Sequence, residues 1–129
     1  MSDLSNSLQI AATGLRAQAQ RLRHTSENIA NADTPGYRRK TVPFEDMVGA
    51  GEIGGVRTGR VQLDQGDPQR IYDPNHPLAD ETGHYDGSNV DLVVEIADAR
   101  EAQRSYEANL KVFDQARQMS AGLLELLRR

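Results

Sequence analysis

The chain has 129 residues, the size of one domain or of one domain with an insert. Its formal net charge of −4 argues against a general nucleic-acid-binding protein, no stretch approaches the roughly 20 apolar residues of a membrane span, and the lack of cysteine excludes disulfides, zinc–thiolate sites and cysteine nucleophiles. Hydrophobic residues make up only 37 % of the chain and Trp is absent, so the chain cannot fill a large core.

Charge is distributed unevenly along the chain. Residues 1–40 carry six Lys and Arg against three Asp and Glu, residues 41–89 carry three against nine, and residues 90–129 carry six against seven. The middle is therefore the acidic part. This distribution predicts a solvated insert between two less charged ends.

A first helix is predicted from Asp3 to Ala30, with Asp3 in the first turn, where a carboxylate suits the helix dipole. Its apolar stripe is thin and much of its neighbourhood is Ala, so we expect the helix to need a packing partner. The stripe recurs every seven residues at Leu8, Leu15, Leu22 and Ile29.

The helix is expected to end at residues 31–36, because Pro35 restricts the residue before it and Pro-Gly favours a turn. Residues 37–44 are predicted to be extended, and Pro43 confines them to an edge or a loop. The basic run Arg38 to Lys40 could bind an acidic partner or form a solvated strand edge.

Residues 49–87 are rich in Gly, Pro and Asp. The best strand candidates are 56–64 and 69–72, and the turn at 65–68 between them predicts a small hairpin. Residues 72–80 contain too many prolines for a helix and are too polar for a central strand.

The last third, 90–127, has helical periodicity without Pro or Gly before Gly122, and Ser88 or Asn89 is the expected N-cap. Such a helix would be about 55 Å long, more than a small domain needs. Its seam alternates three and four residues apart. The seam comprises Leu92, Ile96, Ala99, Gln103, Tyr106, Leu110, Phe113, Arg117, Ser120, Leu124 and Leu127.

Two segments could have a role other than helix packing. His76, Asp80 and His84 would share a helical face and could bind a metal, but the prolines and glycines around them disfavour a helix. Leu123 to Leu127 with the following Arg128-Arg129 resembles a membrane-surface helix, but acidic residues throughout the segment favour core or partner contact. No Gly-x-Ser-x-Gly motif is present, and the string Gly49-x-Gly51-x-x-Gly54 follows no convincing strand and opens no helix. We therefore expect no catalytic, cofactor or metal site.

The stretch Asn28-Ile-Ala-Asn-Ala-Asp-Thr-Pro-Gly-Tyr-Arg-Arg39 resembles the N-terminal signature of flagellar rod and hook proteins, Asn-Ile-Ala-Asn-x-x-Thr-Pro-Gly-Tyr. Stretches 76–85, 88–91 and 104–109 and the short length make the chain similar to a short proximal rod protein of this axial-protein superfamily. Asp33 departs from the common Asn, and His84 precedes Tyr85 where Tyr-Val is expected. The matching residues are Asn28, Asn31, Thr34, Pro35, Gly36, Tyr37, His76, Pro77, Asp80, Asn89, Tyr106 and Asn109.

The resemblance implies a mainly α fold, in which two long terminal helices pack as an antiparallel coiled-coil-like pair around a small irregular or β-hairpin insert. The expected division is 1–36 and 89–129 for the two helices of the axial domain and 37–88 for the insert. It also implies a structural subunit of the proximal rod, the drive shaft that crosses the bacterial periplasm. Its expected partners are other rod proteins and copies of itself.

Members of this superfamily pass unfolded through the flagellar type III export apparatus without signal cleavage. That agrees with the N-terminus, which has no basic region followed by an apolar run. We expect no nucleic acid, small-molecule substrate or membrane insertion. Three alternatives stay open: another short proximal rod protein, a small metal-binding protein using His76 and His84, and a free-standing coiled-coil adaptor that would form a well-folded oligomer by itself.

Overall fold

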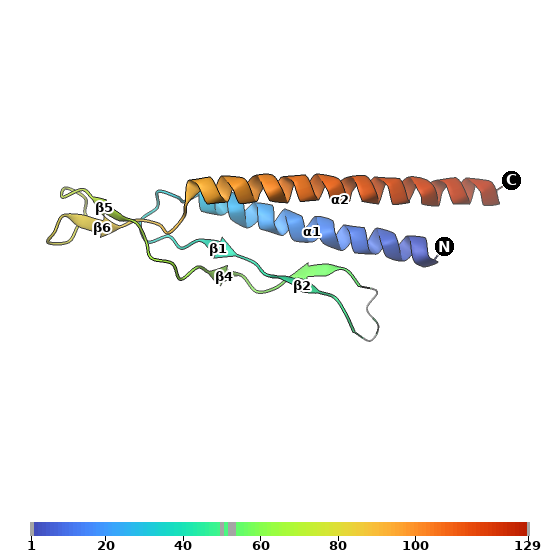
Figure 1. The fold of residues 1–129 in the computed structure, drawn as a ribbon, viewed down its shortest axis with the longest axis horizontal. Coiled ribbons are helices and arrows are strands. Elements are labelled where there is room, and N and C mark those ends of the chain that lie inside the picture. Colours follow the sequence, from blue (N-terminus) through green and yellow to red (C-terminus); the bar gives the residue numbers. More distant parts are fainter. Residues whose placement is uncertain (1, 50, 52–53, 129) are drawn as a thin grey trace.

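The computed structural model describes residues 2–49, 51 and 54–128. Two helices, α1 (Ser2–Ala30) and α2 (Leu92–Leu127), lie side by side and antiparallel, so both chain ends are at the same end of the molecule (Figure 1). This arrangement, with small antiparallel sheets between the helices, confirms the predicted fold class. The strands are β1 (Lys40–Thr41), β2 (Phe44–Asp46), β3 (Val56–Thr58), β4 (Gln62–Leu63), β5 (Arg70–Tyr72) and β6 (His84–Asp86).

Helix α1 ends where the sequence predicted. The Asn31 N–H still donates to the Glu27 carbonyl at 3.1 Å, and the Thr34 N–H then closes a turn on the Asn31 carbonyl at 3.0 Å. Gly36 follows with φ of 75°, a conformation that costs glycine little. The chain therefore leaves the helix through a tight, defined turn.

Helix α2 starts later than predicted. Its N-cap is Asp91, whose side chain accepts from the Val93 N–H at 3.0 Å, so the predicted caps at Ser88 and Asn89 are wrong. Both of those side chains have other partners: the Ser88 hydroxyl donates to the Ala32 carbonyl, and Asn89 Oδ1 accepts from the Arg39 N–H. They tie the approach to α2 to the segment that leaves α1.

The strands form three two-stranded antiparallel pairs, β1–β4, β2–β3 and β5–β6. The predicted hairpin between 56–64 and 69–72 is therefore wrong. Residues 56–63 pair instead with the extended segment after α1, as Lys40 opposite Leu63 and Phe44 opposite Thr58, while Ile71 pairs with Tyr85. Asn89 Nδ2 donates to the carbonyls of Asp64 and Gly66, and these bonds connect the turn after β4 to the segment before α2.

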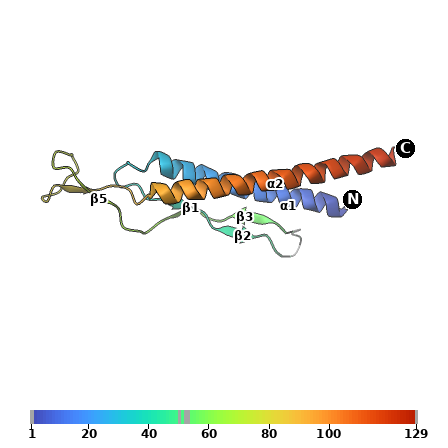
Figure 2. The same ribbon diagram turned by 45° about the horizontal axis from the view of Figure 1, so that its top comes forward.

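The strands occupy two places around the helices. The ribbon formed by β1–β4 and β2–β3 runs back along α1, and the Val56 N–H donates to Thr13 Oγ1 at 3.0 Å (Figures 1 and 2). The β5–β6 pair projects beyond the end of the helices as a separate arm. Among the described residues, no helix is long and apolar enough to cross a membrane.

The two helices meet through small and polar side chains. Ala102 is fully buried, and a Cβ added to Gly14 would lie 3.0 Å from Asn109 Nδ2, so the Asn109 side chain occupies the space that Gly14 leaves. Few large apolar groups fit into so narrow a gap. The buried residues of the two helices, as far as the structure describes them, are Ala11, Ala17, Thr25, Asn28, Glu95, Ala102 and Ala116.

The predicted seam of α2 lies mostly beside this contact. Tyr106 and Phe113 are half-buried, but the contact itself follows positions 95, 102, 109 and 116. A straight helix drifts by about 20° per heptad, so a heptad stripe that starts at the flank reaches the contact only further along. The exposed members of the predicted seam include Leu92, Ile96, Leu110, Leu124 and Leu127.

The apolar stripes of both helices lie on the side away from the ribbon. Residues two apart in a helix point in nearly opposite directions. Thr13, two residues before Leu15, bonds to the ribbon, so Leu15 points away from it. Likewise Val112 lines a groove with Phe44 of the ribbon, so Leu110 points away from it. We call this the leucine face: half-buried Leu8, Leu15, Leu22 and Ile29 of α1, and exposed Leu92, Ile96 and Leu110 of α2.

Replacing Ala102 with Leu tests the close approach of the helices. The larger side chain has no space at the contact and should destabilise the helical pair by about 1–3 kcal/mol, whereas Ala108→Leu on the exposed side of α2 should cost little. The measurement is helical circular dichroism during titration with a stabilising osmolyte, which favours the compact state. Equal titration curves for the two variants would show that the helices are not in tight contact at Ala102.

Candidate functional site

Asn28 is the centre of a buried polar junction at the closed end of the helical pair, and only 1 % of its surface is exposed. Its Nδ2 donates to the Lys40 carbonyl at 2.9 Å and to Glu95 Oε2 at 3.3 Å. Its Oδ1 accepts from the Tyr37 hydroxyl at 2.8 Å and from the Lys40 N–H at 2.9 Å. One side chain thus connects α1, the turn, β1 and α2, and both of its polar atoms are satisfied.

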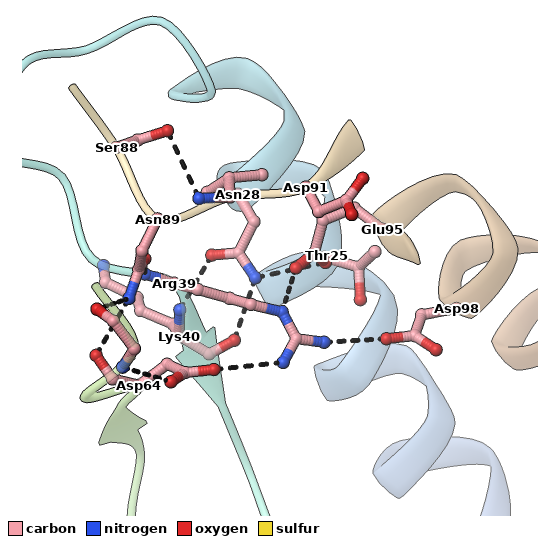
Figure 3. Close-up of polar contacts among 12 residues, drawn as sticks. Thr25, Asn28, Arg39, Lys40, Asp64, Ser88, Asn89, Asp91, Glu95 and Asp98 are labelled. Atoms are coloured by element: carbon pink, nitrogen blue, oxygen red, sulfur yellow. Dashed lines mark hydrogen bonds and ion pairs between the residues drawn. The ribbon is translucent and has the colours of Figure 1, made fainter. Parts of the chain in front are cut away.

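Arg39 provides the charge of the junction (Figure 3). Its Nε donates to Glu95, which is 1 % exposed, its Nη2 donates to Asp98 at 2.8 Å, and its Nη1 lies 3.6 Å from Asp64 Oδ2. Burial acts to lower the pKa of Arg39, but the hydrogen bond and charge of Glu95 and the nearby aspartates outweigh it and raise the pKa. The buried carboxylate of Glu95 is therefore held by a permanent cation and by Asn28.

The rest of the N-terminal motif shapes the turn. Asn31 Nδ2 donates back to the Glu27 carbonyl at 2.8 Å, and the Thr34 hydroxyl donates to Asn31 Oδ1 at 3.1 Å. After half-buried Pro35, the Gly36 N–H donates to the Gly87 carbonyl, and the Tyr37 carbonyl accepts from the Asn89 N–H. The motif therefore positions Tyr37 and the basic run rather than a reactive group.

The basic run has partners inside the chain. Besides Arg39, the Lys40 ammonium lies 3.1 Å from Glu27 Oε2, and this hydrogen bond lowers the pKa of Glu27. Arg38 donates to the carbonyls of Asp64 and Gly66. The acidic partners of this run, Glu27 for Lys40 and Asp64, Glu95 and Asp98 for Arg39, thus lie within the chain.

The second part of the motif lies in the arm. The His76 ring stacks on Tyr85 with centroids 3.9 Å apart, and Pro77 is exposed. Asp80 accepts from Thr82 and from Arg70, and these hydrogen bonds lower the pKa of Asp80. Within the described part of the chain no three His, Asp or Glu side chains are grouped as metal ligands, and His84 instead contacts Thr82.

The remaining motif residues lie along the helices. Asn109 faces Gly14 across the helix contact, and Tyr106 is half-buried beside it. Sequence reasoning missed Glu95, because a carboxylate in an amphipathic helix is normally assigned to its solvated face. The signal that could have identified it is its spacing, seven residues before Ala102 and fourteen before Asn109.

Removing the Glu95 carboxylate should open the junction. Glu95→Ala leaves Arg39 and Asn28 without their buried partner and should cost about 3 kcal/mol, the lower end for a broken buried pair, because Arg39 keeps Asp98. The matched control is Glu101→Ala, which removes an exposed ion pair with Arg21 and should cost about 0–1 kcal/mol. Osmolyte titration of helical circular dichroism measures both, and similar losses would contradict the central place of Glu95.

Two protein-family models match this chain, one in its N-terminal part and one in its C-terminal part. Residues 8–38 match the family model described as flagella basal body rod protein, and residues 81–126 match the model described as flagellar basal body rod FlgEFG protein C-terminal. The first match covers most of α1 and the turn motif, and the second covers the base of the arm and α2.

Individual relatives align over nearly the full chain. The flagellar basal-body rod protein FlgC of Agrobacterium fabrum is 44 % identical, covering 99 % of this chain and 98 % of the relative. The FlgC proteins of Salmonella typhimurium and Escherichia coli O157:H7 are 36 % and 37 % identical, each covering 95 % of this chain and 97 % of the relative. The chain belongs to the FlgC family of flagellar basal-body rod proteins.

Proposed function

We propose that this chain is a structural subunit of the proximal rod and assembles with other rod proteins and with copies of itself through its terminal helices. Membership of the FlgC family supports the rod and its structural role. The observation that supports the contact surface is the leucine face, where the large apolar side chains lie outside the intrachain contact.

The isolated chain leaves large apolar side chains of the leucine face uncovered. Leu92, Ile96 and Leu110 are each at least 39 % exposed, and the helix contact is filled by alanines and polar groups. Burying a large apolar side chain stabilises by about 1.5–3 kcal/mol, so neighbours that cover this face would supply the stability that the helical pair lacks. Exposed apolar faces of this kind mark protein contact surfaces.

In this assembly the helices and the insert have different roles. Segments 1–36 and 89–129 form one axial helical domain that lines the tube, and segment 37–88 faces outward. Packing of these helices would transmit torque and keep the export channel continuous. The chain travels unfolded through the flagellar type III export apparatus without a cleaved signal, acts in the periplasmic space, and inserts into no membrane.

The junction has a structural task in this proposal and no catalytic one. Its charged groups form ion pairs with each other: Arg39 binds Glu95 and Asp98, and Lys40 binds Glu27. The relatives named above are structural rod proteins, which supports a non-enzymatic role. The motif residues hold the helices and the ribbon in one fixed geometry, so every subunit presents the same faces to its neighbours.

Charged substitutions on the leucine face test the proposal. Leu110→Asp or Leu15→Asp should abolish incorporation into the rod and motility, because an uncompensated carboxylate would be buried against a neighbour. Lys111→Asp, next in sequence but pointing elsewhere on α2, is the matched control and should assemble. Swimming halos and immunoblots of isolated basal bodies measure the outcome, and normal assembly of the leucine-face variants would exclude this face as the contact.

The purified chain distinguishes a rod subunit from a free-standing coiled-coil adaptor. We expect a monomer with largely disordered terminal segments, because the helical contact buries few large apolar groups. Sedimentation gives the oligomeric state, and circular dichroism with hydrogen exchange gives the order of the termini. A well-folded oligomer in dilute solution would support the adaptor instead.

A further inference from the structure

The arm, residues 70–86, has its own hydrogen-bond network and projects from the rest of the molecule (Figure 1). β5 and β6 pair at three positions, and the loop between them is held by the Asp73 N–H to Gly83 and Asp80 N–H to His84 backbone bonds. The stack of His76 on Tyr85 braces it further. A projecting element that is already rigid loses little entropy when it binds a partner.

The surface of the arm combines apolar and acidic groups. Tyr72 is 66 % exposed and Leu78 is 62 % exposed. Residues 72–86 contain four carboxylates and no Lys or Arg. Arg70 pairs with Asp80 and Asp86, so Asp73 and Glu81 have no cationic partner among the described residues. The arm therefore fits a surface that is apolar and basic.

The end of α2 is such a surface. The helix continues beyond the start of α1 (Figure 1), and Leu124, Leu126 and Leu127 are 49 %, 64 % and 74 % exposed. Residues 117–129 contain three Arg and one Glu, and Arg117 pairs with Asp114 of the same helix at 3.8 Å. The end of α2 is thus apolar like the arm and opposite to it in the sign of its net charge.

The arm and the end of α2 lie at opposite ends of the long molecule (Figure 1), so they cannot meet within one chain. We propose that the arm binds the C-terminal end of α2, residues 117–128, of a second copy. Contacts between two different surfaces at opposite ends are heterologous, and they form an open helical assembly when the rotation between subunits does not close a ring. This proposal rests on the proposed function and adds a subunit contact that is distinct from the leucine face.

Cross-linking tests the contact directly, because the chain has no cysteine of its own. The variant Leu78→Cys with Leu126→Cys is expressed in full-length form in motile cells and treated with a short bismaleimide. We expect products at twice the chain mass and at higher multiples. Each single variant, and Leu78→Cys with Val112→Cys on the exposed middle of α2, should lose these higher multiples.

Motility before treatment separates the two proposals. Motile cells without the expected products would overturn the arm contact and leave the rod function intact, and products that contain another rod protein instead of a second copy would overturn it equally. Charge exchange decides the matter if the cysteine pair impairs motility. Asp73→Lys with Glu81→Lys, or Arg128→Glu with Arg129→Glu, should each weaken motility, and combining all four should restore it, whereas absence of restoration would overturn the contact.

Discussion

The buried contact of Asn28 with Glu95 and Arg39 is the interaction on which the other elements depend. It joins the last turns of α1, the first turn of α2 and the first residues of the ribbon in one hydrogen-bonded group. Burying the Glu95 carboxylate without its partners is costly. Helix α2 therefore packs on α1 only when the turn places Arg39 beside Glu95. The turn motif therefore fixes the register of the two helices.

That register explains the outer surface. With Asn28 opposite Glu95 and Gly14 opposite Asn109, small and polar side chains fill the contact between the helices. The large apolar residues are displaced to the flanks, above all to the leucine face. A single chain is left with a polar, narrow contact inside and apolar surface outside, which is the distribution that a polymer subunit needs and a solitary domain avoids.

Much of the fold could be predicted from the sequence, because long periodic helices and a Pro-Gly turn are local signals. The strand pairing could not, since residues 56–63 pair with residues 40–46 across a long connection, and the turn after β4 bonds to Arg38 and Asn89, which are remote in the sequence. The helix contact was misplaced for a related reason. Large apolar residues at heptad spacing suggested the inner seam, whereas Glu95 is stable inside only because Asn28 and Arg39, remote in the chain, satisfy it.

The most direct test of the account is an image of the assembled basal body at side-chain resolution. In that image, helices of neighbouring subunits should cover Leu15, Leu22 and Leu110 of each subunit. Asn28, Arg39 and Glu95 should stay bonded within one chain. A leucine face open to water in the finished rod, or an Arg39 that reaches across to another subunit, would contradict this account.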